Sequence, residues 1–183
     1  MAVCGSVDDR HGIVLAKSEM AKKNGVKTGM AIWQAKQVCP KLEVVPPDYE
    51  LYMYFSRKLR HIYEDYTNQV EPFGLDECWL DISQRGRDIW EGERIAQEIR
   101  QRVKSELGIT VSIGVSFNKV FAKLGSDYKK PDAVTVISED NYRQLIWPLP
   151  VTAMLFVGHT AAEQLHKLEI RTIGEMAQAD PAT

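Results

Sequence analysis

Two adjacent carboxylates, Asp76 and Glu77, interrupt the otherwise apolar stretch FGLDECWLD at residues 73–81. Removing two neighbouring carboxylates from water costs free energy unless a cation or hydrogen-bond donors compensate. Mg²⁺ prefers oxygen ligands, usually one or two carboxylates together with waters and substrate phosphates. Two such ions can stabilise the attacking and leaving oxygens of a phosphoryl transfer. The pair is therefore a candidate Mg²⁺ site for nucleotidyl transfer.

The same pair also has a purely structural interpretation. Side chains of neighbouring residues in a regular strand point to opposite faces. Asp76 and Glu77 can therefore converge only where the strand begins, directly after Gly74. In the structural interpretation, Glu77 faces solvent and Asp76 caps the bend. A third acid, Asp81, is expected to end the strand or to pair with a basic neighbour, not to bind metal.

A second group of chemically capable residues is the lysine-rich stretch SIGVSFNKVFAKLGSDYKKP at 112–131, which reads as a strand followed by a helix. Pro131 restricts Lys130 to extended backbone and so holds its side chain in a turn. A fixed ammonium there suits a phosphate. The alternative is a solvated helix face whose basic end favours the helix dipole.

A third candidate site lies near the C-terminal end of the chain. Gly158 stands just before TAAE, where Thr160 and Glu163 are expected to form a capping box at a helix start. Free amides at such a start can bind an anion, and His159 and Lys167 are nearby. Contact with a DNA backbone without base reading is one interpretation. A plain helical hairpin is the other.

The elements around these residues predict an α+β protein. A short apolar run at 12–16 precedes two expected short helices at 17–25 and 30–40. Together they form a lysine-rich lobe that ends at Pro46-Pro47. Asp48 is expected to cap a long helix. Two strands joined at Gly74, a second long helix over 95–107, and strands at 110–115 and 133–137 around a helix at 119–127 follow. This order predicts helices packed on one face of a mainly antiparallel sheet, and then a helical lobe separate from the sheet.

Composition limits the class of protein. The chain has 183 residues, 44% of them hydrophobic and 26% charged, and a net charge of −2, as in ordinary globular proteins. No apolar run reaches the ~20 residues needed to span a bilayer, so no membrane partner is expected. Three scattered cysteines indicate a reducing, cytoplasmic setting. Neither end resembles a finished domain edge, so we expect a fragment.

Three motifs resemble those of the Y-family translesion DNA polymerases. GLDECWLD is similar to the family's serine-isoleucine-aspartate-glutamate-alanine-tyrosine-leucine-aspartate motif, with Asp76 and Glu77 on the metal-binding acids. The stretch at 112–137 is similar to the next signature, and LPVTAMLFVGHTAAEQLHKLEIRTIGEMA resembles the thumb's helix–hairpin–helix. The residues of the second signature that are in register are Asn118, Lys119, Ala122, Lys123, Ser126, Asp127, Lys130 and Pro131.

The resemblance implies template-directed DNA synthesis past damaged bases, in DNA repair and the SOS response, by an enzyme that uses Mg²⁺. It implies fingers at 1–47, a palm with a ferredoxin-like mixed sheet at 48–137, and a linker with a partial thumb at 138–183. Lys130 would contact the incoming deoxynucleoside triphosphate. Primer–template DNA would be gripped at the thumb, and a sliding clamp could bind through regions outside this chain. The thumb residues concerned are Gly158, His159, Thr160 and Lys167.

The chain also departs from the family pattern. A first strand with another metal-binding aspartate, and the little-finger domain, are expected to be absent, and Asp8 and Asp9 are no substitute. We therefore predict that this chain alone is not a competent polymerase. Many family members have a tyrosine and, three residues later, an arginine in the fingers. This chain has Glu19 and Lys22 at those positions. Lys22 keeps the charge for a triphosphate but loses the bidentate fork of arginine.

One further departure lies in the thumb, where Phe156 occupies the position of a glycine in the family's hairpin. Two rival functions also remain. GLDE resembles the Gly-Gly-Asp-Glu of palm-type nucleotide cyclases, although the lysine-rich stretch and the C-terminal hairpin argue against them. The other rival is a non-catalytic DNA-binding remnant of the polymerase fold.

Overall fold

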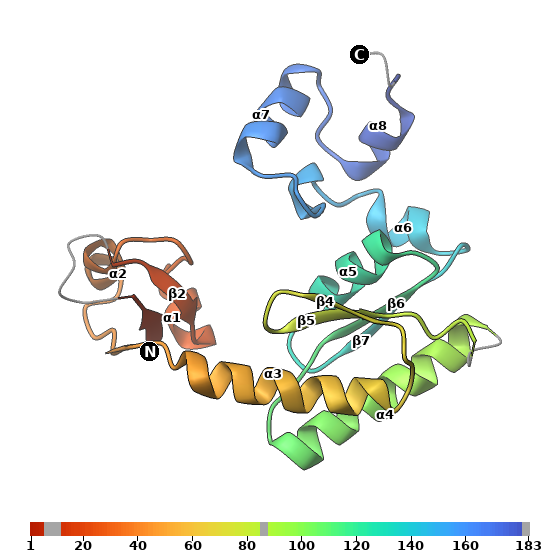
Figure 1. Ribbon diagram of the computed structural model, residues 1–183. Helices are drawn as coiled ribbons and strands as arrows, with labels where there is room; N and C mark the ends of the chain where they lie inside the picture. Colours follow the sequence, from red (N-terminus) through yellow and green to blue (C-terminus); the bar gives the residue numbers. More distant parts are fainter. Residues whose placement is uncertain (6–11, 85–87, 181–183) are drawn as a thin grey trace. The chain divides into compact units, whose positions relative to one another are not determined.

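A computed structural model describes residues 1–5, 12–84 and 88–180 (Figure 1). Asp8 and Asp9 lie outside the described residues. The chain divides into two compact units, Met1–Met53 and Tyr54–Thr183, and each unit is described by itself.

The first unit is a small three-stranded sheet with two short helices. Its strands are β1 (Ala2–Cys4), β2 (Val14–Lys17) and β3 (Val44–Val45), in the order β2-β1-β3, with β1 antiparallel to β2 and parallel to β3. The helices are α1 (Glu19–Lys23), which the Ser18 side chain caps, and α2 (Ile32–Val38). Both helices expected in this region are confirmed.

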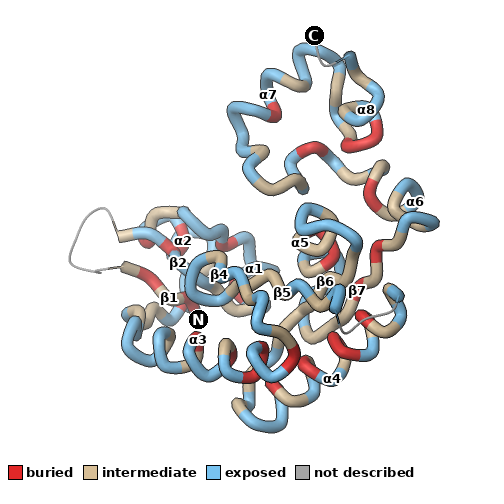
Figure 2. Tube along the Cα trace, turned by 45° about the vertical axis from the view of Figure 1, so that its right-hand side comes forward, coloured by how far each residue is buried: buried red, intermediate tan, exposed pale blue. Residues whose placement is uncertain are grey.

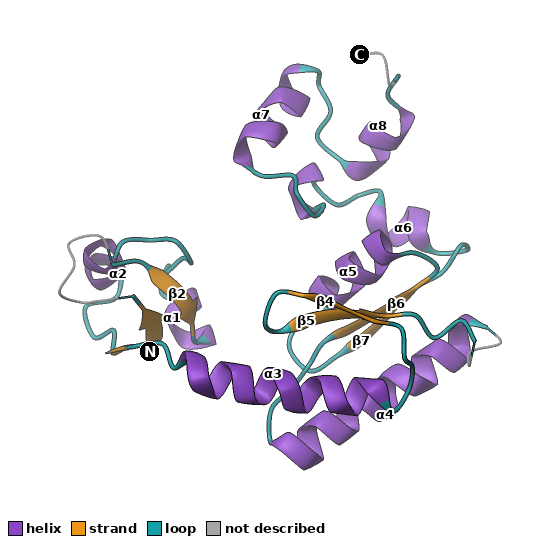
Figure 3. Ribbon diagram, in the orientation of Figure 1, coloured by secondary structure: helices purple, strands orange, loops and turns teal. Residues whose placement is uncertain are grey.

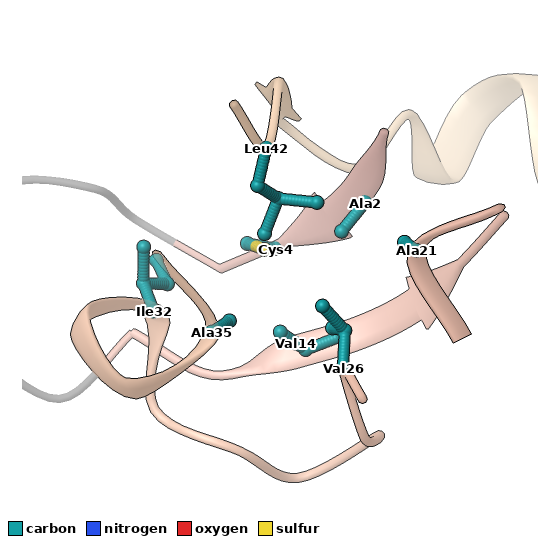
Figure 4. Packing of buried hydrophobic residues seen from close by; sticks show 8 residues of the cluster. All are labelled: Ala2, Cys4, Val14, Ala21, Val26, Ile32, Ala35 and Leu42. Carbon is teal, nitrogen blue, oxygen red and sulfur yellow. The ribbon is translucent and has the colours of Figure 1, made fainter. Parts of the chain in front are cut away.

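Short side chains fill the core of the first unit (Figure 4). Cys4 is fully buried among them, and Cys39 packs against their edge. All three cysteines of the chain are free thiols, so they behave as small hydrophobic side chains, as expected. The core residues are Ala2, Cys4, Val14, Ala21, Val26, Ile32, Ala35 and Leu42.

Two long helices carry the largest core of the second unit. Helix α3 (Tyr49–Glu64) begins after Asp48, whose carboxylate accepts the Leu51 amide at 2.9 Å, and α4 (Ile89–Leu107) ends at Gly108 in the left-handed region (φ +69°). Buried residues recur along both helices (Figure 2). They pack against strands β4 (Val70–Phe73) and β5 (Glu77–Leu80).

The other strand pair of the second unit is parallel. Strands β6 (Ile113–Ser116) and β7 (Val134–Ile137) run in the same direction and are joined through helix α5 (Lys119–Tyr128). A parallel pair needs such a crossover connection. The expected α+β class is confirmed, but the described strands form two separate pairs in this unit, and the expectation of a mainly antiparallel sheet fails for β6 and β7.

Helices cover both faces of the β6–β7 pair (Figures 1 and 3). A Cβ atom on Gly114 would lie 1.9 Å from the Ala122 carbonyl oxygen of α5. Val115, the next residue, contacts α4 at Gly92. Because neighbouring strand residues face opposite sides, α5 and α4 lie on opposite faces. The sequence pattern had indicated helices on one face.

The C-terminal helices share a core with the strands. Helix α6 (Tyr142–Ile146), a 3₁₀ turn (Val151–Ala153), α7 (His159–Lys167) and α8 (Ile173–Gln178) follow β7. Ile146 and Ile173 are buried in one cluster with Leu124 of α5 and Ile137 of β7. The expected separation of a helical lobe from the sheet therefore does not hold for α8.

The capping box lies on a different helix from the one expected. Gly158 occupies the cap position of α7, which places Thr160 inside the first turn, where it caps nothing. The reciprocal pair is Thr172 and Glu175 at the start of α8: the Thr172 hydroxyl accepts the Glu175 amide at 3.2 Å, and the Glu175 carboxylate accepts the Thr172 amide at 2.8 Å. No helix in the described part of the chain has the length and apolarity needed to cross a bilayer.

Asp132 joins the turn after α5 to helix α4, and it gives a pH-dependent prediction. Lys104 and Arg100 each donate to its carboxylate at 2.7 Å and hold its pKa below the ordinary value. The stabilisation of the fold by these two ion pairs is therefore present above about pH 4, and it is lost as pH falls through the depressed pKa of Asp132. We expect Asp132→Asn, which tolerates the same left-handed backbone (φ +53°), to melt at a lower temperature than wild type at pH 7. Thermal melts at pH 7 and pH 3 check this. An equal difference in melting temperature between wild type and variant at both pH values would contradict it.

Candidate active site

The hairpin that carries the two candidate acids forms as expected. Strands β4 and β5 are antiparallel, with Phe73 opposite Glu77 and Val70 opposite Leu80. The turn between them is Gly74, Leu75 and Asp76, and Gly74 has a positive φ of +74°, which glycine adopts without a steric penalty. Asp76 is therefore the last turn residue, and Glu77 is the first residue of β5.

The two faces of the hairpin contact different helices. Val70, Cys78 and Leu80 pack against the core of α3 and α4. On the other face, the Glu77 carboxylate accepts Lys123 Nζ of α5 at 2.7 Å, and Trp79 Nε1 donates to the Lys119 carbonyl oxygen at 3.1 Å. The interpretation in which Glu77 simply faces solvent is wrong, because Glu77 is half-buried and paired with α5.

Asp76 is exposed in the turn, and its charge affects a tyrosine of α3. The pKa of Tyr63 on α3 is raised to about 12, first by burial and then by the neighbouring Cys78 thiol and the Asp76 charge. Asp76 is thus close to α3 electrostatically, while Glu77 is held by α5. The two candidate ligands are adjacent in sequence at the tip of the hairpin, and different helices surround them.

Four charged residues form a continuous chain from the hairpin along α5. Lys123 Nζ lies 2.7 Å from Glu77 Oε1 and 2.8 Å from Asp127 Oδ2, and Lys130 Nζ lies 2.6 Å from Asp127 Oδ1. Burial acts to lower the pKa of Lys123, but the hydrogen bonds to Asp127 and Glu77 outweigh it and raise that pKa. Burial acts to raise the pKa of Asp127, and the hydrogen bonds from both lysines lower it instead.

The chemistry of the hairpin fits a divalent metal held partly by other ligands. Asp76 and Glu77 offer hard oxygen donors at the tip of a hairpin, and Mg²⁺ is commonly held by one or two carboxylates with waters and substrate phosphates. Among residues 1–5, 12–84 and 88–180, no group of three or more His, Cys, Asp or Glu side chains is arranged to hold a metal. These two residues alone would therefore supply the protein ligands from the described part of the chain.

The structure places the other predicted residues as follows. Lys130 is about half exposed and pairs with Asp127. Lys22 lies in the first unit, where its ammonium is 3.7 Å from the Glu19 carboxylate and both side chains are exposed. An ion pair between two exposed side chains is weak, so the Glu19 charge remains beside Lys22. Asp81 directly follows β5 and accepts the Ser83 amide at 2.9 Å, so it ends the strand, as expected.

The predicted thumb residues are gathered at the start of α7. Gly158 caps the helix, His159 and Thr160 form its first turn, and all three are exposed. The His159 ring lies 3.6 Å from the Glu163 carboxylate, one turn along. Lys167 is exposed in the last turn, so it lies at the opposite end of the helix from the other three.

Phe156 has the backbone conformation of the glycine that it replaces. Its φ is +68°, and its side chain is 84% exposed, with its ring edge-on to Phe73 at a centroid distance of 6.3 Å. A left-handed backbone is costly for a residue with a Cβ. The position therefore keeps the hairpin geometry expected for glycine and presents an aromatic ring instead.

This strain gives a prediction for stability. Phe156→Gly is expected to raise the free energy of unfolding by about 0.5–1 kcal/mol, because relief of the left-handed strain exceeds the entropic cost of glycine. Urea unfolding measures the difference. Phe156→Ala is the control, because alanine removes the ring but keeps the Cβ. Equal stabilisation by alanine and glycine would show that the ring, not the backbone, is responsible.

A cavity of about 550 Å³ lies beside the hairpin. It is lined by both strands of the hairpin and by the segment from Ser116 to Lys119 at the start of α5. Neither Asp76 nor Glu77 lines this cavity. The candidate site is therefore the open tip of the hairpin and the adjoining face of α5.

The comparisons with known proteins agree with this arrangement. Residues 1–127 match the impB/mucB/samB family. The chain is 58% identical over 177 residues to a DNA polymerase IV of Acetivibrio thermocellus and 43% identical over 180 residues to DNA polymerase IV 1 of Bacillus subtilis. These alignments cover 97% and 98% of this chain but only 44% and 43% of those proteins. The chain therefore spans less than half the length of these relatives.

Solved structures give the same result at the level of the fold. The crystal structure of DinB from Sulfolobus solfataricus superposes with a TM-score of 0.88 at 27% identity, over 98% of this chain and 52% of that chain. An insertion ternary complex of Dbh DNA polymerase superposes equally well, with a TM-score of 0.88 over 98% of this chain and 53% of that chain. The chain belongs to the impB/mucB/samB family, and its fold is that of the Y-family DNA polymerases.

Proposed function

We propose that this chain is part of a DNA polymerase that copies a template strand, including past damaged bases, by nucleotidyl transfer. The observation that carries the proposal is the pair Asp76 and Glu77 at the tip of the β4–β5 hairpin, within a fold that superposes on a polymerase ternary complex over 98% of its length. In this proposal, residues 1–47 are the fingers, 48–137 the palm, and 138–183 a linker and partial thumb.

The two hairpin carboxylates would hold Mg²⁺. When bound, the ion would help to activate the primer 3′-hydroxyl and neutralise charge on the incoming triphosphate. Glu77 is suited to this role because the strand register fixes its backbone at the start of β5. Asp76 is suited because it is exposed. Both therefore present oxygen ligands without further rearrangement of the strand.

Other residues of the site would bind the substrates. Lys130, at the end of the chain of ion pairs, would contact the triphosphate. Lys22, in the first unit, would be a further candidate cation for a triphosphate. Gly158, His159 and Thr160 would contact the DNA backbone through the start of α7, where free amides favour phosphate, and Lys167 would add charge. Contacts of this kind give affinity without reading sequence.

Primer extension tests the proposal against its rivals. The experiment uses the full-length natural protein that contains this chain, with Mg²⁺, deoxynucleoside triphosphates, and primers on an undamaged template and on one with an abasic site. Extension on both templates is the expected result. DNA binding without extension would favour a non-catalytic DNA-binding protein. Conversion of GTP to a cyclic product without a primer would favour a nucleotide cyclase.

A further inference from the structure

Lys123 is held between two carboxylates that come from different elements. Glu77 belongs to β5, while Asp127 lies one turn further along the same helix as Lys123. The lysine side chain is only 16% exposed, less than either carboxylate. A charge that is withdrawn from water to this extent requires partners, so both contacts hold the ammonium at the base of the candidate metal site.

The contact occupies one oxygen of the candidate ligand. Lys123 Nζ lies 2.7 Å from Glu77 Oε1, a distance typical of a charge-assisted hydrogen bond. A divalent ion bound by the same carboxylate would experience repulsion from this ammonium, and in a partly buried site such repulsion is weakly screened. Lys123 and a metal are therefore competitors for the charge of Glu77.

The far end of the chain of ion pairs has an exposed cation. Asp127 accepts Lys123 with one oxygen and Lys130 with the other, and Lys130 is 53% exposed. Asp127 therefore holds both lysines at once, one with each oxygen, and links Lys123 to the exposed Lys130.

We propose that Lys123 is a positioning residue that acts as the resident cation of Glu77 and lowers the affinity of the hairpin for divalent metal. When Glu77 binds metal, Asp127 retains the ammonium of Lys123. The proposal rests on the proposed function, in which Glu77 is a metal ligand.

Metal affinity without substrate tests the competition directly. Mn²⁺ binding to the full-length natural protein is measured by calorimetry, with no DNA or nucleotide present. Lys123→Met is expected to bind Mn²⁺ about tenfold tighter than wild type, because the competing charge is gone. Lys119→Met is the matched control: it removes an ion pair of the same kind, with Glu71 at 2.6 Å, one turn earlier on α5, and it is expected to leave the affinity within about twofold.

Asp127→Asn has an expected effect of opposite sign. Without Asp127, Lys123 has Glu77 as its remaining carboxylate partner among those described, and Mn²⁺ affinity is expected to fall about threefold or more. Lys123→Arg keeps the positive charge, so its Mn²⁺ affinity is expected to stay close to that of wild type. A merely structural role for Lys123 would make Lys123→Met and Asp127→Asn change the affinity in the same direction. Circular dichroism on each variant confirms that the fold is retained, and Lys123→Arg with Asp127→Asn still tests the proposal if Lys123→Met does not fold.

Glu77→Gln separates the two levels of the argument. If this variant loses Mn²⁺ affinity but Lys123→Met binds no tighter than wild type, the role of Lys123 is overturned and the proposed function stands. If Glu77→Gln binds Mn²⁺ as wild type does, Glu77 is not a ligand and the metal assignment itself fails. The proposal is supported when Glu77→Gln weakens binding, Lys123→Met tightens it, and Asp127→Asn weakens it.

Discussion

Replacement of Asp76 by asparagine is expected to lower the rate of primer extension at least about a hundredfold, because a carboxylate that holds a catalytic metal contributes several kcal/mol to transition-state stabilisation. Asparagine has nearly the same size and removes only the charge. Asp76 is exposed in a turn, so the fold is expected to be unaffected. Single-turnover extension with the full-length natural protein at saturating DNA measures the loss.

The control for this prediction is Asp81→Asn. Asp81 is also an exposed acid of the same motif, but it ends β5 and bonds to the Ser83 amide. We expect its variant to extend primers at a rate within about threefold of wild type, as for a surface change away from the site. Equal losses in Asp76→Asn and Asp81→Asn would show that the motif tolerates no change of charge, and would remove the case for Asp76 as a ligand.

Gly114→Ala is expected to destabilise the second unit by about 4 kcal/mol or more, above the usual cost of overpacking. A Cβ at this position would lie 1.9 Å from the Ala122 carbonyl oxygen and 2.6 Å from the Ser126 amide nitrogen. Both atoms belong to the backbone of α5, so rotation of a side chain cannot relieve the clash. Helix α5 would have to shift away from β6, and with it Lys123, which holds Glu77.

Urea unfolding followed by circular dichroism measures this effect. Gly158→Ala is the matched control, because nothing lies within 4 Å of a Cβ placed there and its φ of −80° suits alanine. The control is expected to lower the free energy of unfolding by no more than about 1 kcal/mol, the cost of alanine in place of glycine at a helix cap. A Gly114→Ala protein as stable as the control would contradict the close approach of α5 and β6.

The sequence predicts local features of this fold well. The turn glycine at 74, the cap residue Asp48 and the strands on either side of α5 all follow from residue types and spacing, and the structure has them. The positive φ of Phe156 is a conformation that glycine adopts readily, at the position where the resemblance expects glycine. These features depend on neighbours within a few residues, which is the range over which such patterns operate.

Features that depend on distant residues were not predictable. Alternation of apolar residues identifies a strand but not the direction of its partner, so the parallel pairing of β6 and β7 was missed. The pattern of Thr or Ser followed three residues later by Glu occurs at both Thr160 and Thr172, and only the position of the helix start decides between them. The bridge from Lys123 to Glu77 joins residues 46 positions apart.

Single-nucleotide incorporation tests the central claim, that Asp76 and Glu77 form the metal site of a template-directed DNA polymerase. Each deoxynucleoside triphosphate is offered singly opposite each template base, with Mg²⁺ and then with Mg²⁺ chelated, to the full-length natural protein and its Asp76→Asn variant. The account predicts that incorporation follows the template base, requires the divalent ion, and is lost in the variant. Incorporation by Asp76→Asn at the wild-type rate, or incorporation indifferent to the template base, would contradict it.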